Sequence, residues 1–216
     1  MSYSKKDILT SISLMFFIIS FAIVFTVFFK PLYYSDIYRL SIDVSSGYSI
    51  AVIKENYDIL ISYQSIFYQG PLVLKDFVMS EGGRIHFEEV KIIFEIVQMI
   101  MAVSFCTSLF LVLSQLKKGE FRFFRLTAII TVVLPLIIAA LAAIDFDQAF
   151  ILFHKVVFRN DYWIFDAVTD PIINILPQDF FMHCLMMIIG IVIAGVFICY
   201  GIYIKMRKHY LKTDEM

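Results

Sequence analysis

The chain has 216 residues, of which 60% are apolar and 17% are charged, and its formal net charge is −1. Soluble globular chains are about half apolar and about a quarter charged, so this composition excludes an ordinary soluble domain. Four stretches are long and apolar enough to form helices that cross the roughly 30 Å hydrocarbon core of a bilayer. We therefore predict an integral membrane protein with four spanning helices.

The first predicted span follows Lys5 and Lys6, and no small-x-small cleavage pattern follows Phe29, so we expect a retained anchor rather than a signal peptide. One charge, Glu95, lies in the second span, and Pro135 lies in the third, where a neighbouring helix can cover the missing amide donor. The four predicted spans are 8–29, 92–116, 126–144 and 180–204.

Basic residues separate the two sides of the membrane. Ten of the 18 lie in three short segments, before the first span, between the second and third, and after the fourth. They are Lys5, Lys6, Lys117, Lys118, Arg122, Arg125, Lys205, Arg207, Lys208 and Lys212. The longer segments and their borders hold the other eight, with fifteen acidic residues. Because short cytoplasmic loops collect Lys and Arg, both termini are predicted to be cytoplasmic. The acidic outer face, without a basic patch, disfavours nucleic acid as a partner.

The two outer segments, 30–91 and 145–179, are each too short to bury a core alone. Apolar residues alternate over 40–44 and again over 72–74, which predicts two short strands. Between them a helix is predicted from Ser49, because four apolar residues share one face: Ile50, Ile53, Tyr57 and Leu60. We therefore predict a single membrane domain, 1–216, in which a small mixed α/β extracytoplasmic cap tops a mainly α bundle.

The second outer segment contains an amphipathic helical pattern, carried by Phe150, Phe153, His154 and Val157. Tyr162 and Trp163, which follow it, suit the level of the lipid headgroups. This segment is therefore expected to lie at the outer membrane surface.

Motifs for hydrolases, nucleotide binding and zinc peptidases are absent from the sequence, and no cofactor is predicted. Four histidines remain as groups that exchange protons near neutral pH. His209 lies in the basic tail, and His183 lies at the start of the fourth span. His86 and His154 both lie at the predicted outer surface among acids and aromatics. The three cysteines are predicted to pack within the spans: Cys106, Cys184 and Cys199.

His86 follows the pair Gly82-Gly83, where the second helix is expected to begin. Helical spacing places Glu89 on the same face, so a carboxylate can orient the imidazole for catalysis. Two other interpretations of His86 fit the same residues. His86 is either a hydrogen-bonded interfacial histidine or, with Glu89 and His154, part of a three-ligand metal site that no strict ligand motif supports.

Two strings of residues resemble the bacterial lipoprotein intramolecular transacylase family. One runs over 79–91 and includes His86-Phe87 and Glu89-Val90-Lys91; the other runs over 153–163. Further similar positions are Glu55-Asn56-Tyr57, Tyr63, Asp166, Asp170, Ile172-Ile173, Pro177 and Phe180-Phe181. The four-span layout agrees with the family over nearly the whole chain. The sequence departs from it at Asp166-Ala167, where Asp-Pro is expected, and at Pro171, where an aliphatic residue is more usual.

The resemblance implies a membrane enzyme that moves the sn-2 acyl chain of a diacylglyceryl-cysteine lipoprotein onto the α-amine of the same cysteine, giving the lyso-form lipoprotein. Amine and ester close a ring of about eight atoms, so proximity supplies much of the lowering of the barrier. His86 is then the base, and His154 supports the tetrahedral intermediate or donates a proton. With the resemblance, the candidates for substrate positioning are Glu89, as an orienting carboxylate, and four residues that shape the pocket: Tyr57, Asn160, Trp163 and Asp166. For these four the alternative is that they only pack the cap onto the bundle.

The implied partners are a diacylated lipoprotein and membrane lipid, and the implied location is the bacterial cytoplasmic membrane with the active site at the outer leaflet. One alternative is a non-enzymatic membrane accessory protein whose outer cap binds a partner and whose histidines are structural. A metal-dependent membrane hydrolase is the third reading.

Overall fold

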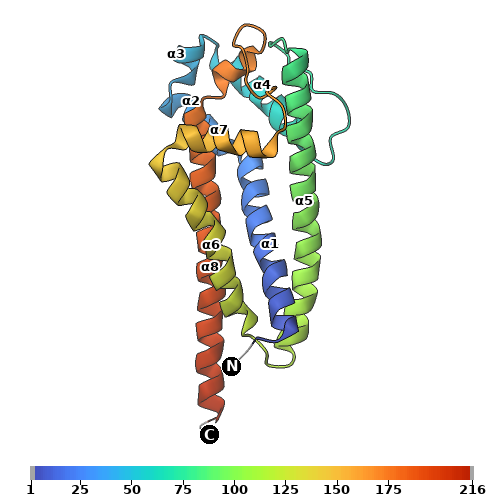
Figure 1. Cartoon of the computed structure of the whole chain (residues 1–216), viewed down its shortest axis with the longest axis vertical. Coiled ribbons are helices and arrows are strands. Elements are labelled where there is room, and N and C mark those ends of the chain that lie inside the picture. Colours follow the sequence, from blue (N-terminus) through green and yellow to red (C-terminus); the bar gives the residue numbers. More distant parts are fainter. Residues whose placement is uncertain (1–2, 215–216) are drawn as a thin grey trace. The chain divides into compact units, whose positions relative to one another are not determined.

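The computed structural model describes residues 3–214, with side chains as far as residue 211, so the side chain of Lys212 lies outside the described residues. The chain forms helices joined by turns and irregular segments (Figure 1). They are α1 (Lys5–Phe28), α2 (Lys30–Arg39), α3 (Ile42–Ser46), α4 (Ile50–Tyr63), α5 (Glu81–Leu116), α6 (Phe123–Ile144), α7 (Phe146–Val157), the 3-10 helix η1 (Pro171–Ile175) and α8 (Gln178–Asp214).

Four helices are long and apolar enough to cross a membrane, namely α1, α5, α6 and α8. Three of them contain a predicted span entirely, and α1 contains the first span except for its last residue, Phe29, so the four-helix prediction is confirmed. Helix α5 begins at Glu81, beside the glycine pair where the second helix is expected to begin, and continues through the predicted span that starts at Ile92. His86 therefore lies in the second turn of the same continuous helix that provides the second span.

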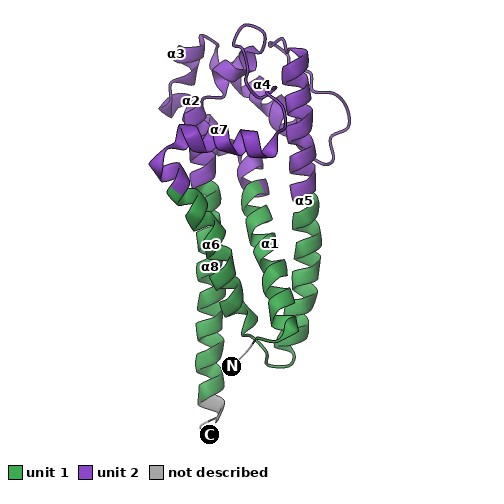
Figure 2. Ribbon diagram, viewed as in Figure 1, with its two compact units in different colours: residues 1–23, 98–140, 187–216 green, residues 24–97, 141–186 purple. Residues whose placement is uncertain are grey.

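The chain divides into two compact units, which Figure 2 colours separately. The first contains residues 1–23, 98–140 and 187–216, and the second contains 24–97 and 141–186. All three of the short basic segments belong to the first unit. His86, His154 and both predicted outer segments belong to the second unit.

Polar side chains and one glycine join the helices of the first unit. The hydroxyl of Ser11 donates to the carbonyl of Phe123 at 3.0 Å, and that of Ser13 donates to the carbonyl of Ser104 at 3.2 Å. A Cβ at Gly195 would lie 2.8 Å from Cγ2 of Ile18, so only glycine lets α8 approach α1 this closely. Small residues and hydroxyl donors are the usual means by which helices associate within lipid.

The second unit has an aromatic core built from α2, α4, η1 and the start of α8. The rings of Tyr33 and Tyr57 stack with their centroids 3.6 Å apart, and Phe180 meets both edge-on. The hydroxyl of Tyr33 donates to the carbonyl of Ile175 at 2.6 Å, so its buried oxygen is satisfied. Helix α4 buries Ile53, Tyr57 and Leu60, which confirms the face predicted from their spacing.

The predicted strands are wrong, since none of the residues from 3 to 214 forms a strand. Over 40–44 the chain turns at Ser41, which has a φ of 50°, and then enters the short helix α3. Gly47 ends that helix with a φ of 74°. Alternation over so few residues fits a turn and one helical turn as well as a strand. An isolated strand would also leave backbone donors and acceptors without partners.

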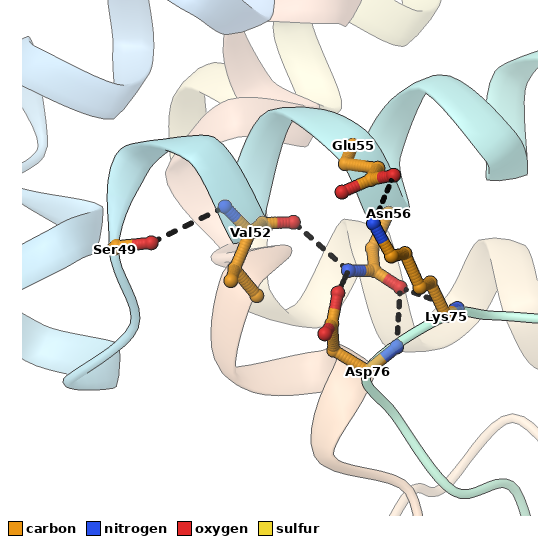
Figure 3. A network of polar contacts seen from close by, with 6 residues as sticks. All are labelled: Ser49, Val52, Glu55, Asn56, Lys75 and Asp76. Atoms are coloured by element: carbon orange, nitrogen blue, oxygen red, sulfur yellow. Dashed lines mark hydrogen bonds and ion pairs between the residues drawn. The ribbon is translucent and has the colours of Figure 1, made fainter.

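The second predicted strand is an irregular segment that Asn56 attaches to α4 (Figure 3). Asn56 is fully buried, and its Nδ2 donates to the carbonyl of Val52 at 2.9 Å and to Oδ2 of Asp76 at 2.7 Å. Its Oδ1 accepts from the backbone amides of Lys75 at 2.9 Å and Asp76 at 3.2 Å. A side-chain amide thus supplies the bonds that a partner strand would have supplied, and Leu74 is buried beside it.

Candidate active site

His86 is buried among aromatic rings near the N-terminus of α5. Its side chain is 6% exposed, and its ring centroid lies 4.7 Å from that of Phe158 and 5.4 Å from that of Phe165. Its Nδ1 is buried without a hydrogen-bond partner in the described part of the chain. A buried ring nitrogen with no partner of its own is suited to take a proton from, or donate one to, a bound ligand.

His154 lies in α7, whose N-terminus is capped by Asp145, since Oδ1 of Asp145 accepts from the amide of Gln148 at 3.0 Å. The Nδ1–H of His154 donates to the carbonyl of Phe150 at 2.7 Å, because a carbonyl can only accept. In the neutral ring, Nε2 therefore carries the lone pair. Burial lowers the pKa of His154 below its ordinary value of 6.5, against the opposing effect of the Phe150 carbonyl.

The two imidazoles face a shared aromatic environment. Their ring centroids are 6.1 Å apart, with an angle of 35° between the rings. His154 also stacks against Trp163 at 4.9 Å, and Phe158 lies against both histidines. Residues 68 positions apart in the sequence are thus brought together by α5 and α7. The sequence singled out both histidines, but only the family resemblance pointed to a catalytic pair.

Glu89 bonds to Asn160 and not to His86. The Nδ2 of Asn160 donates to Oε1 of Glu89 at 2.8 Å. The amide orientation is fixed because Oδ1 of Asn160 accepts from the backbone amide of Tyr162 at 3.1 Å. Asn160 also accepts, through its carbonyl, from the indole N–H of Trp163 at 3.1 Å. The second oxygen of Glu89, Oε2, is buried and has no hydrogen-bond partner among the described residues.

Asp170 holds the first turn of α5, a role that was not predicted. Its side chain is 3% exposed, and its Oδ1 accepts from the backbone amide of Ser80 at 2.8 Å. A Cβ at Gly83 would lie 2.1 Å from that oxygen, so glycine is required there. A carboxylate is also favoured by the partial positive charge of a helix N-terminus. The glycine pair and Asp170 were both visible in the sequence, but their distance along the chain hid the contact.

The other predicted positioning residues lie in different surroundings. Trp163 stacks on His154, whereas Tyr57 is 2% exposed in the aromatic core and has no ring contact with either histidine within residues 3–214. Asp166 is exposed, and its Oδ1 accepts from the amide of Val168 at 2.7 Å, which closes the turn after Trp163 without the proline that the family pattern has there. The roles predicted for these residues stay predictions.

A third histidine, His183, pairs with a buried acid in the same unit. The Nδ1 of His183 lies 2.8 Å from Oδ2 of Asp36, whose side chain is fully buried. Nothing in the local sequence of either residue indicated the pair. No three His, Cys, Asp or Glu side chains in the described part of the chain are grouped so that they could hold a metal ion.

Comparisons with known proteins identify the family. The family model "Lipoprotein intramolecular transacylase Lit" matches residues 8–181. The solved structure of the membrane integral lipoprotein intramolecular transacylase Lit from Bacillus cereus is 37% identical, covers 96% of each chain and has a TM-score of 0.94. Among curated proteins, none matches.

Two further structures of the Bacillus cereus protein carry one histidine replaced, by arginine or by alanine. The arginine variant is 36% identical and covers 96% of this chain and 93% of its own, and the alanine variant is 37% identical and covers 96% and 94%; both have a TM-score of 0.87. The accessory-protein reading is set aside, because these matches extend over nearly the whole chain and are to an enzyme. This chain therefore belongs to the family of lipoprotein intramolecular transacylases, which are integral membrane enzymes.

Proposed function

We propose that His86 and His154 carry the acyl transfer from the sn-2 position of a diacylglyceryl-cysteine lipoprotein to the α-amine of that cysteine. The observation that carries this proposal is the pair of imidazoles 6.1 Å apart, on α5 and α7, in an aromatic environment. The substrate provides both nucleophile and acyl donor in one molecule. The protein therefore has to fold the substrate and move protons.

The proton balance calls for two proton-accepting groups. An α-ammonium that becomes an amide loses two protons; one ends on the glycerol oxygen that leaves, and the other goes to solvent. One base must free the amine before attack. A second must take a proton from the nitrogen of the tetrahedral intermediate and deliver it to the leaving alkoxide. Two neutral imidazoles meet this need without a cofactor.

The tautomer of His154 suits the second task. Because its Nδ1–H is bonded to the carbonyl of Phe150, its Nε2 can accept a proton from the intermediate. The charged ring then donates that proton, first to the oxyanion as a hydrogen bond and then to the glycerol oxygen. We assign the first task, removal of a proton from the ammonium, to His86.

The aromatic residues around the histidines limit the competing reaction. A water molecule that attacked the ester would hydrolyse it rather than transfer the chain. Phe150, Phe158 and Phe165 lie against the two imidazoles and provide no polar side-chain atom that would hold such a water. An apolar site also fits the acyl chains of the substrate.

The proposed orientation places both termini in the cytoplasm and the site at the outer leaflet of a bacterial cytoplasmic membrane. All three short basic segments belong to the first unit, and the histidines belong to the second. The positive-inside rule assigns the basic segments to the cytoplasm. The partners are then a diacylated lipoprotein and the surrounding lipid.

Mass spectrometry of a reporter lipoprotein tests the proposed function. The reporter is expressed in cells that lack lipoprotein N-acylation, with and without this chain. We expect an N-terminal cysteine of unchanged total mass that fragments with one acyl chain on nitrogen. A diacylglyceryl cysteine that keeps its free amine, despite normal expression of the chain, would contradict the proposal.

A further inference from the structure

Glu89 has one carboxylate oxygen engaged and one without a partner. Asn160 fixes Oε1, and the orientation of Asn160 is itself set by the backbone amide of Tyr162. Oε2 is buried, and no hydrogen-bond partner for it exists among the described residues. A buried acceptor without a donor costs free energy, which a bound ligand that supplies the donor would recover.

The basic residues of the same helix are engaged elsewhere. Arg84 pairs with Glu81 and with Glu88, and Lys91 pairs with Glu95 at 3.1 Å. Among the side chains described, residues 3–211, no Lys, Arg or His forms an ion pair with Glu89. The site therefore contains a carboxylate whose charge the protein itself leaves without a cationic partner.

The reacting end of the substrate carries one cation. Its ester and thioether are neutral, and only the α-ammonium of the cysteine is both charged and a donor of hydrogen bonds. We infer that Glu89 binds this ammonium through Oε2 and so selects lipoproteins whose N-terminal amine is free. The inference rests on the proposed function and names what the same site recognises. The product is a neutral amide, which loses this interaction and is released more readily.

His86 lies three residues before Glu89 in α5, so the two side chains share one helical face. Its unpartnered Nδ1 can accept from the same ammonium. Glu89 stabilises the charged form of the amine and therefore opposes its deprotonation, which is the task of His86. The contribution of Glu89 thus lies in substrate binding rather than in turnover.

Competition between unreactive analogues measures this selection. Both analogues carry an ether in place of the sn-2 ester; one has the α-amine, and the other has a hydroxyl of similar size. Against purified wild-type enzyme we expect the amine analogue to inhibit about 10- to 100-fold more strongly, as befits a charge-assisted hydrogen bond. In Glu89→Gln the ratio of the two inhibition constants should fall close to unity, with the hydroxyl analogue bound as before.

Glu88→Gln is the matched control. It removes a negative charge at the position next to Glu89, where Glu88 forms an exposed ion pair with Arg84. It should keep the wild-type ratio. A second measurement needs no variant: the advantage of the amine analogue on wild-type enzyme should disappear as the pH rises above about 8, where an α-amino group loses its charge. The inference is overturned if wild-type enzyme does not distinguish the analogues, or if Glu89→Gln distinguishes them as well as wild type does. Failure of the proposed function would be seen separately, as absence of acyl transfer from the ester-linked amine substrate.

Discussion

Asn56 and Asn160 are two side-chain amides in the same unit, and they differ in what surrounds them. Asn56 donates two hydrogen bonds and accepts two, so every donor and acceptor of its side-chain amide has a partner within the protein (Figure 3). The side-chain amide of Asn160 also donates and accepts, but the carboxylate to which it donates, that of Glu89, has a second oxygen, Oε2, without a partner among the described residues. The Nδ1 of His86, also in the second unit, is buried without a partner too.

The difference separates a network that a ligand could complete from one that it could not. A network whose donors and acceptors are all satisfied gains nothing from a ligand, so its role is to hold the chain. A network that leaves buried acceptors unused is stable only if something else repays their desolvation, and a substrate can do so. Substitutions in the two networks should therefore change different properties.

Replacement of His86 by Asn should have the largest effect. We expect the rate of acyl transfer to fall by about 10³-fold or more, because a positioned general base contributes about 10²- to 10⁴-fold. The reaction needs two such bases, so His154 alone does not suffice. The lyso-form of a reporter lipoprotein, measured by mass spectrometry, is the readout. His209→Asn, at an exposed position in α8, serves as the control and should keep wild-type activity. Normal formation of the lyso-form by the His86 variant would remove His86 from the mechanism.

Replacement of His154 by Asn tests the role of Nε2 apart from that of Nδ1. The amide of Asn can take the place of Nδ1–H toward the carbonyl of Phe150, but it has nothing at the position of Nε2. We expect about a 10²-fold loss of rate with the fold retained, as judged by an unchanged thermal midpoint at pH 7.5. The role proposed for Nε2 would be wrong if this variant transferred the acyl chain at the wild-type rate.

Asn56→Ala should act on stability instead. It leaves the backbone amides of Lys75 and Asp76 without their acceptor and is expected to lower the free energy of unfolding by about 2–4 kcal/mol. The thermal midpoint reports this loss, while the rate of transfer below the transition should stay close to wild type. Glu55→Gln is the control, since the exposed Glu55–Lys75 pair contributes only about 0–1 kcal/mol. A variant that loses activity but not stability would place Asn56 among the substrate-binding residues.

The sequence predicted the helices well where one local property decides the outcome. Long apolar runs give the four spanning helices, and the spacing of Ile53, Tyr57 and Leu60 gives the buried face of α4. The strands failed because alternation over a few residues is also produced by a turn followed by a short helix, as at Ser41. The glycine pair Gly82-Gly83 indicated where the second helix begins, and α5 does begin beside it at Glu81, but the contact for which Gly83 makes room, with Asp170, could not be foreseen.

The site was predictable only in part, because its contacts join residues far apart in the sequence. His86 and His154 were identified as candidates by their residue type and surroundings. The bond from Asn160 to Glu89 spans 71 positions, and the pair of Asp36 with His183 spans 147. No periodicity within a helix reports which acid will lie beside which amide or imidazole.

The smallest expected effect is a pH dependence of stability that comes from His154. Its pKa is lowered in the folded protein by burial, so the unfolded chain binds the proton more readily. Above about pH 6.5, the ordinary pKa of histidine, the ring is neutral in both the folded and the unfolded chain, so its burial does not lower the stability. As the pH falls from there through the folded pKa, the unfolded chain takes up the proton first and the folded protein loses stability. The thermal midpoint of wild type should therefore fall relative to that of His154→Asn between pH 7.5 and 5. A difference between the two proteins that stays constant over this range would show that the imidazole of His154 is not desolvated, and His154 would then be a solvated residue rather than part of a dry catalytic pair.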